Sequence, residues 1–113
     1  MLNDAALTLA ANAVKNAITH LQLHSAAPGA AGTTAAVGTR VASTGTVDAD
    51  GDITWSNAAF TGLPANQTVT HVSYWTAATG GTFYGSVALT GDTAANAAGA
   101  YTVTSITETS TAT

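Results

Sequence analysis

The sequence has no cysteine and very few charged side chains. Asp, Glu, Lys and Arg make up 7% of its 113 residues, against roughly 25% in an average soluble protein. Without cysteine the chain cannot form disulfides, thiolate zinc sites or a cysteine nucleophile. The two permanent cations, Lys15 and Arg40, are too few to line a phosphate-binding groove or to dock on anionic lipid. We therefore expect no nucleic-acid partner and no membrane partner.

Targeting signals and long apolar runs are also missing. The chain begins Met1-Leu2-Asn3-Asp4, whereas a secretory signal needs a basic start before an apolar run of roughly 7–15 residues. No window approaches the roughly 20 apolar residues of a membrane-spanning helix. We expect synthesis in the cytoplasm without a signal peptide.

What the sequence does contain is small side chains, with 26 Ala and 22 Thr. A surface of Ala, Thr, Ser and Asn loses little side-chain entropy and little hydration when other protein covers it. This composition favours a protein that assembles, and it names no activity.

One helix is predicted over Asn3–Ala17. Asn3 or Asp4 can cap its first amide groups, and Asp4 suits the positive end of the helix dipole. Three- and four-residue spacing predicts a narrow apolar stripe that packs on a sheet or on a neighbouring subunit. Its members are Leu2, Ala6, Leu9, Ala10, Ala13 and Ala17.

The rest of the chain alternates with the period of β-strands. Strands are predicted near residues 19–24, 40–47, 53–60, 68–76, 83–89 and 101–106, with loops at 25–38 and 62–67. In the 68–76 strand both parities carry apolar residues, so the sequence leaves its buried face open. The candidate core clusters are Leu21/Leu23, Ile53/Trp55, Phe83/Val87/Leu89 and Tyr101/Val103.

These elements predict a mainly β protein, an antiparallel β-sandwich of jelly-roll or immunoglobulin-like type with one N-terminal α-helix. We expect a single domain over residues 1–113, with the helix at about 3–17 and the sandwich at about 18–108.

Two groups of side chains could hold a metal. His20 and His24 lie about 13 Å apart in a strand at 3.3 Å per residue, too far to chelate one ion, although a site shared across a symmetric interface stays open. The simpler interpretation places His20, Gln22 and His24 on the solvent or interface face of an edge strand. Asp48-Ala49-Asp50-Gly51-Asp52 has the alternating oxygens of a calcium loop without the distal glutamate, and it also fits a hairpin turn. No cofactor is predicted.

The sequence lacks the spacing signatures of nucleophilic, glycosidase, phosphate-loop and dinucleotide-binding sites, so we expect no enzyme. Strand aromatics, such as Trp55, Trp75 and Tyr84, could stack on sugars at an exposed face, but they fill a sandwich core more often.

Two segments resemble small structural proteins from the virion gene blocks of actinobacterial, mycobacteriophage-like tailed phages. They are "LNDAALTLAANAVKNAITHLQLHSAAPGAAG" and "VTHVSYWTAATGGTFYGSVALTGD", which combine strand alternation with fixed turn glycines. The resemblance implies a non-enzymatic minor tail, tail-tip or fibre protein. Capsid decoration and glycan or receptor binding at the tail tip are the alternatives.

The expected location is the virion, in the tail rather than the capsid, with copies of the chain and other virion proteins as partners and a trimer as one option. The interface is predicted at Leu2, Leu9, Ala13, His20, Gln22 and His24.

Overall fold

The computed structural model describes residues 2–110 and is mainly β, as the sequence predicts. Helix α1 spans Asp4–Ala17. The strands are β1 (His20–His24), β2 (Ala36–Ala42), β3 (Thr46–Val47), β4 (Ile53–Phe60), β5 (His71–Trp75), β6 (Phe83–Ala88) and β7 (Tyr101–Glu108).

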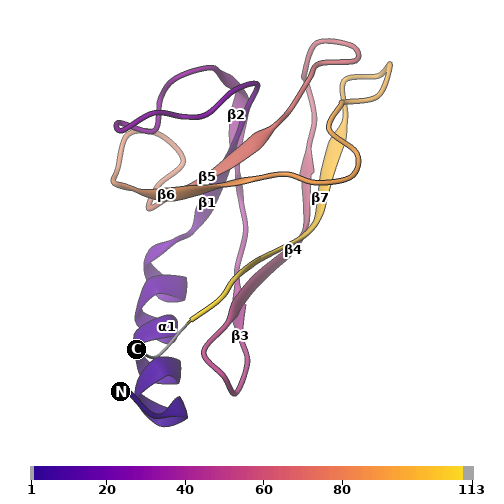
Figure 1. The fold of residues 1–113 in the computed structure, drawn as a ribbon. Coiled ribbons are helices and arrows are strands. Elements are labelled where there is room, and N and C mark those ends of the chain that lie inside the picture. Colours follow the sequence, from indigo (N-terminus) through magenta and orange to yellow (C-terminus); the bar gives the residue numbers. More distant parts are fainter. Residues whose placement is uncertain (1, 111–113) are drawn as a thin grey trace.

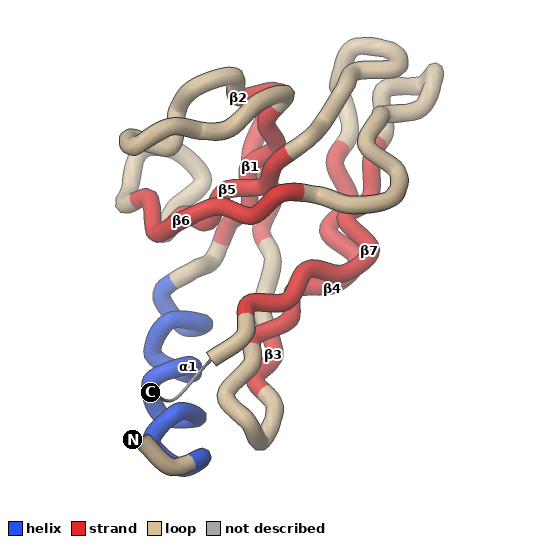
Figure 2. Tube along the Cα trace, in the orientation of Figure 1, coloured by secondary structure: helices blue, strands red, loops and turns tan. Residues whose placement is uncertain are grey.

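The strands form two antiparallel sheets. One has four strands in the order β2-β1-β5-β6, and the other has three in the order β3-β4-β7. The four-stranded sheet lies across one end of an elongated body, and α1 extends from it beside the β3–β4 turn (Figures 1 and 2). No helix in residues 2–110 has both the length and the hydropathy needed to cross a bilayer.

Helix α1 begins where its N-cap predicts. The Asn3 side chain accepts a hydrogen bond from the Ala6 amide at 3.0 Å, which satisfies one of the first unpaired N–H groups. Asp4 lies in the first turn and Lys15 in the last, where each charge interacts favourably with the helix dipole. At the other end Ile18 has extended backbone and leads directly into β1.

The predicted 40–47 strand is two strands in different sheets. β2 begins at Ala36, inside the segment predicted as a loop, and ends at Ala42, whereas β3 pairs with β4. The link between them passes the buried Gly45, where a Cβ atom would come within 3.0 Å of Trp55 and Ile53. Glycine therefore lets the backbone cross from one sheet to the other close to the core.

The sequence does not show which face of the 68–76 strand is buried, and in the structure both faces of β5 are covered. Val72 and Tyr74 face the second sheet, where the Tyr74 ring packs on Trp55 with centroids 4.7 Å apart. Ser73 and Trp75 point to the outer side and are also buried. β5 lies between β1 and β6, so apolar residues of both parities are consistent with its central place.

Of the four candidate core clusters, three are buried. The largest fully buried side chains include Trp55, Phe60, Leu21 and Leu23. Phe83, Val87 and Leu89 are only half-buried, because β6 is an edge strand of its sheet.

Candidate functional site: the outward face of helix α1 and the pocket beside it

The side of α1 that packs on the protein carries Leu7, Ala11 and Ile18. Ala11 and Ile18 are buried, and the Leu7 backbone lies against Gly51 in the β3–β4 turn. With Val14 these residues form a series spaced four, three and four residues apart, which is the period of a packed helix face. The predicted stripe runs along other sides of the helix, so this second series is the signal that the sequence analysis missed.

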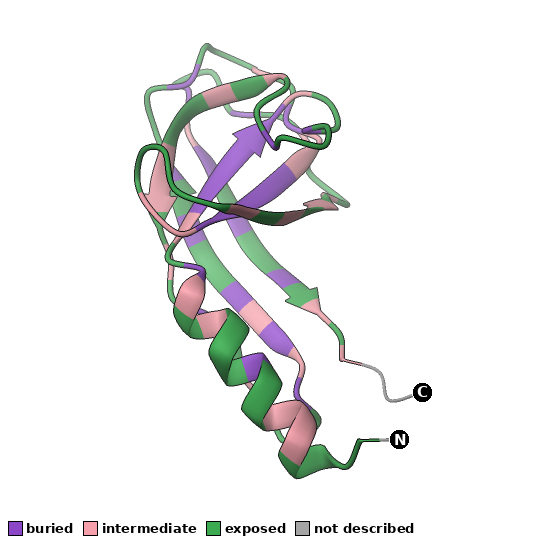
Figure 3. Ribbon diagram, turned by 90° about the vertical axis from the view of Figure 1, so that its left-hand side faces the viewer, coloured by how far each residue is buried: buried purple, intermediate pink, exposed green. Residues whose placement is uncertain are grey.

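The outward face of α1 is open to solvent and carries Leu9 and alanines together with Asn12 and Asn16. Leu9 is 74% exposed and Leu2, which precedes the helix, is 57% exposed; Ala10 and Ala13 are also exposed. Figure 3 shows most of the helix surface as exposed. Leu2 lies just before the N-cap Asn3 and so outside the helix, whereas Leu9 lies within α1.

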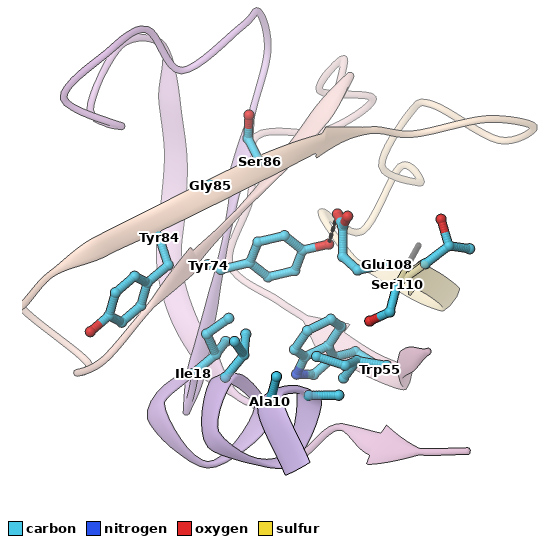
Figure 4. Close-up of a pocket in the computed structure, with 13 residues that line it drawn as sticks. Ala10, Ile18, Trp55, Tyr74, Tyr84, Gly85, Ser86, Glu108 and Ser110 are labelled. Carbon is cyan, nitrogen blue, oxygen red and sulfur yellow. Dashed lines mark hydrogen bonds between the residues drawn. The ribbon is translucent and has the colours of Figure 1, made fainter. Parts of the chain in front are cut away.

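A pocket of about 310 Å³ separates α1 from the sheets (Figure 4). Val14 and Ile18 form its helix side, and Tyr84 of β6, which is 57% exposed, stands at its edge. Val14 and Tyr84 also border a second apolar hollow with Ala13 and Ala17. The pocket and the outward helix face therefore meet along Val14.

Polar groups lie at the opposite end of the pocket. The Tyr74 hydroxyl donates a hydrogen bond to Glu108 Oε1 at 2.8 Å, and Ser110 is close by in Figure 4. Burial and the adjacent Glu108 raise the pKa of Tyr74, so its phenol stays protonated and keeps donating. The indole N–H of Trp55 is buried without a hydrogen-bond partner within the described residues.

The six residues predicted at the interface fall into two groups. Leu2, just before α1, and Leu9 and Ala13, on α1, are exposed, whereas Gln22 and His24 are buried and His20 is half-buried. The edge-strand interpretation of β1 was wrong, since β1 lies between β2 and β5. The Gln22 amide donates to the carbonyl oxygens of Val37 and Gly38, which ties β1 to the irregular part of β2.

His24 is the centre of a buried hydrogen-bond network. Its Nδ1 lies 2.8 Å from the Thr34 carbonyl oxygen, which can only accept, so Nδ1 carries the proton. Its Nε2 therefore accepts from the Ser73 hydroxyl at 2.7 Å, and the Ser73 oxygen accepts from the Trp75 indole N–H at 2.7 Å. This Ser–His pair resembles the hydrogen-bonded pair of a hydrolase, but both residues are 0% exposed and cannot meet a substrate.

Because His24 is buried in this network, we expect acid to lower the stability of the folded protein. Burial lowers the pKa of His24 below 6.5; the Thr34 hydrogen bond opposes this shift, and His71 and Arg40 make smaller contributions that also lower the pKa. The unfolded chain therefore binds a proton more readily than the folded chain below about pH 6.5. Stability should be complete above that pH and fall by up to about 1.4 kcal/mol per pH unit as pH drops toward the folded-state pKa.

Urea unfolding between pH 7.5 and 5 checks this expectation, with His24→Gln as the control. The variant should be less stable at pH 7.5, and its stability should depend less on pH. The other titrating groups are common to both proteins, so the difference between the two curves isolates His24. Parallel curves would contradict the assignment.

The Arg40 side chain lies on the same outer side of the four-stranded sheet. Its guanidinium carbon lies 3.6 Å from the centroid of the Trp75 ring, and Nη1 donates to the carbonyl oxygens of Ala77 and Gly80. One of the two permanent cations is thus used to hold the β5–β6 turn.

The predicted calcium loop forms the β3–β4 turn. The Asp48 side chain accepts from the amides of Asp50 and Asp52, an arrangement that closes the turn through its own backbone. The three carboxylates come within 4.8 Å of one another, and within residues 2–110 no other grouping of three candidate ligands is this close. His20 and His24 are not part of such a group.

Two other segments are fastened to this turn. Asp52 accepts a hydrogen bond from the Ser110 amide, and the Ser110 hydroxyl donates to the Gly51 carbonyl at 2.6 Å. On the opposite side the Thr8 hydroxyl of α1 reaches the Ala49 carbonyl at 3.3 Å. The turn therefore joins the first half of the helix to the end of β7.

Among the strand aromatics considered for sugar stacking, Trp55 and Trp75 are buried and Tyr84 is exposed. Within the described residues, Tyr84 is the one ring of these three that a sugar could reach.

Comparison with known families gives one match. A family model described as "Podophage GP4 fiber I protein gp80" matches residues 2–111. Searches of curated proteins and of solved structures return no match. Because the family model covers nearly the whole chain, the protein belongs to the podophage GP4 fiber I protein gp80 family of phage fibre proteins.

Proposed function

We propose that the chain is a non-enzymatic subunit of a phage tail fibre or tail tip, and that it binds neighbouring subunits through the outward face of α1. The family supports a structural component of the tail. It favours the tail over capsid decoration, and the origin in an actinobacterial phage stays a prediction because the family description names no host.

The exposed face of α1 is the observation that carries this proposal. Leu9 and Leu2 expose most of their surface, although the helix has a separate inner face for the sheets. An exposed apolar row with small neighbours is typical of a surface that another protein covers. Asp4 and Lys15 are the charged residues of the helix, and they lie in its first and last turns rather than beside Leu9.

The buried Ser–His pair supports a non-enzymatic role. A catalytic serine must contact substrate, and Ser73 is enclosed together with His24. A single exposed ring at Tyr84 gives a glycan little to stack on, so the geometry favours attachment to protein over glycan binding.

The substitution Leu9→Asp tests the proposal. Leu9 is exposed, so the monomer should lose no more than about 0.5 kcal/mol. A charge buried unpaired in the subunit interface should weaken self-association or incorporation into virions by about tenfold or more. Sedimentation of the pure protein and mass spectrometry of purified particles measure these effects.

Thr79→Asp, in the exposed β5–β6 turn, adds the same charge away from α1 and serves as the control. It should assemble as the parent protein does. Unchanged assembly and incorporation of the Leu9→Asp protein would refute the role of the helix face.

A further inference from the structure

A groove runs along the free side of β7. It is lined by residues 101–107 of β7 and by the end of β6 with the residues that follow it, including Val87 and Leu89. β7 pairs with β4 alone in the described sheets, so alternate N–H and C=O groups along its other side have no strand partner. Such an edge binds an extended strand through its backbone.

Natural proteins usually protect an edge of this length. The common devices are lysine, proline, an inward charge or a covering segment. β7 reads Tyr101-Thr-Val-Thr-Ser-Ile-Thr-Glu108 and contains neither lysine nor proline, and its one charge is at its end. The half-buried Val87 and Leu89 add apolar surface that an incoming strand would cover.

The side chains of β7 do not alternate regularly, and this restricts which strand can pair with it. Val103 and Ile106 are buried, whereas both Thr104 and Ser105 between them are exposed. β4 shows the matching irregularity at Ser56 and Asn57, where Asn57 has a φ of 56°. If the partner strand alternated regularly, its buried and exposed side chains would match those of one half of β7 and be on the wrong faces along the other half.

We propose that the partner is β7 of a second copy, paired antiparallel about a twofold axis between Thr104 and Ser105. In this register Thr104 faces Ser105 and Thr102 faces Thr107, and the irregular positions of the two strands coincide. Exposed residues face exposed residues, and buried Val103 faces buried Ile106. Thr–Thr and Thr–Ser pairs across strands stabilise a sheet, and a twofold interface needs this self-complementarity.

The two three-stranded sheets would then join into one sheet in the order β3-β4-β7-β7-β4-β3. The paired edge is separate from the outward face of α1, so the proposal goes beyond the proposed function and does not depend on it.

Cysteine cross-linking tests the register, because the chain has no cysteine of its own. In the double variant Thr102→Cys with Thr107→Cys, the new thiol at position 102 of one copy faces the new thiol at position 107 of the other copy. Opposed Cβ atoms lie about 5 Å apart, which suits a disulfide. Within one chain the two positions are about 17 Å apart at 3.4 Å per residue and cannot bond.

Oxidation should convert this double variant to a covalent dimer on non-reducing gels. The yield should be about tenfold above that of either single variant, because a thiol in the register described here does not meet its own copy. The matched control is Thr102→Cys with Thr109→Cys, whose thiols are offset by two residues across the two strands and, like those of the test variant, lie far from their own copies. It should cross-link poorly. Equal yields from the two double variants, or no dimer from either, would overturn the proposal.

A charge variant gives a second measurement without cysteine. Thr104→Lys with Ser105→Lys places four ammonium groups around the twofold axis, so the dimer should dissociate in sedimentation experiments while circular dichroism stays that of the folded parent. Ala78→Lys with Thr79→Lys adds the same charge in the exposed β5–β6 turn and should leave the dimer intact.

The Leu9→Asp substitution separates this proposal from the role of α1. In that background the Thr102–Thr107 cysteine pair should cross-link as before, even where association through the helix is lost. Cross-linking abolished by Leu9→Asp would show that the contact at β7 depends on α1, and the proposal would be wrong.

Discussion

Replacing Gly99 by alanine should destabilise the protein by about 4 kcal/mol, close to the upper end of single substitutions. Gly99 has a φ of 76°, in the left-handed region that costs other residues roughly 1–2 kcal/mol. A Cβ atom there would also lie 2.0 Å from the Leu63 carbonyl oxygen. The Leu63 amide donates to the Gly99 carbonyl at 3.0 Å, so moving the two segments apart would break this hydrogen bond.

Gly91→Ala is the matched control for this prediction. Gly91 has a φ of 78°, but a Cβ atom there would meet no other atom within 4 Å. The control should lose only the backbone contribution, about 1–2 kcal/mol. Urea unfolding of both variants, followed by Trp fluorescence, measures the difference. Equal losses would mean that the contact with Leu63 relaxes without cost.

The substitution Trp55→Ala should cost about 3–5 kcal/mol, the range for deleting a large aromatic side chain from a core. Trp55 is fully buried and packs on Tyr74 between the two sheets. Its removal would leave a cavity continuous with the pocket beside α1, which Trp55 lines. The same change would remove the unpartnered indole N–H, and this relief offsets part of the loss.

Tyr84→Ala serves as the comparison because Tyr84 borders the same pocket from the solvent side. Its ring is 57% exposed, so the loss should stay near or below about 1 kcal/mol. Thermal unfolding of both variants provides the measurement. A Trp55→Ala protein as stable as Tyr84→Ala would show that the two sheets do not depend on this side chain.

Much of the fold could be predicted from local patterns. The Asn3 cap and the helical spacing predict α1 almost to the residue, because the cap's side chain bonds an amide only three residues away. The alternation of Leu21 and Leu23 predicts β1, and alternating apolar residues predict β4 and β7. These signals lie within single elements and need no knowledge of the neighbours.

What the sequence could not show depends on contacts between distant elements. His24 reads as a polar residue facing solvent, but Thr34 and Ser73 satisfy both of its ring nitrogens inside the protein. The central position of β1 follows from its pairing with β5, some fifty residues away. The division of residues 36–47 into β2 and β3 also depends on which sheet each half meets.

For the six residues predicted at an interface, the exposure expected from the sequence holds for the three at the N-terminal end and fails for Gln22 and His24. Leu9 and Ala13 are exposed on α1 and Leu2 is exposed just before it, although Val14 and Tyr84, which connect the helix surface to the pocket, were not included. Their connection arises from the angle between α1 and β6, which no spacing along the chain encodes.

The turn at residues 48–52 has a mechanical consequence. Because it is hydrogen-bonded both to Thr8 and to Ser110, tension applied between the helix and the end of β7 would load these few bonds first. The four-stranded sheet lies outside this short path. A subunit pulled at α1 and at residue 110 should therefore lose these bonds before the strands of its larger sheet separate.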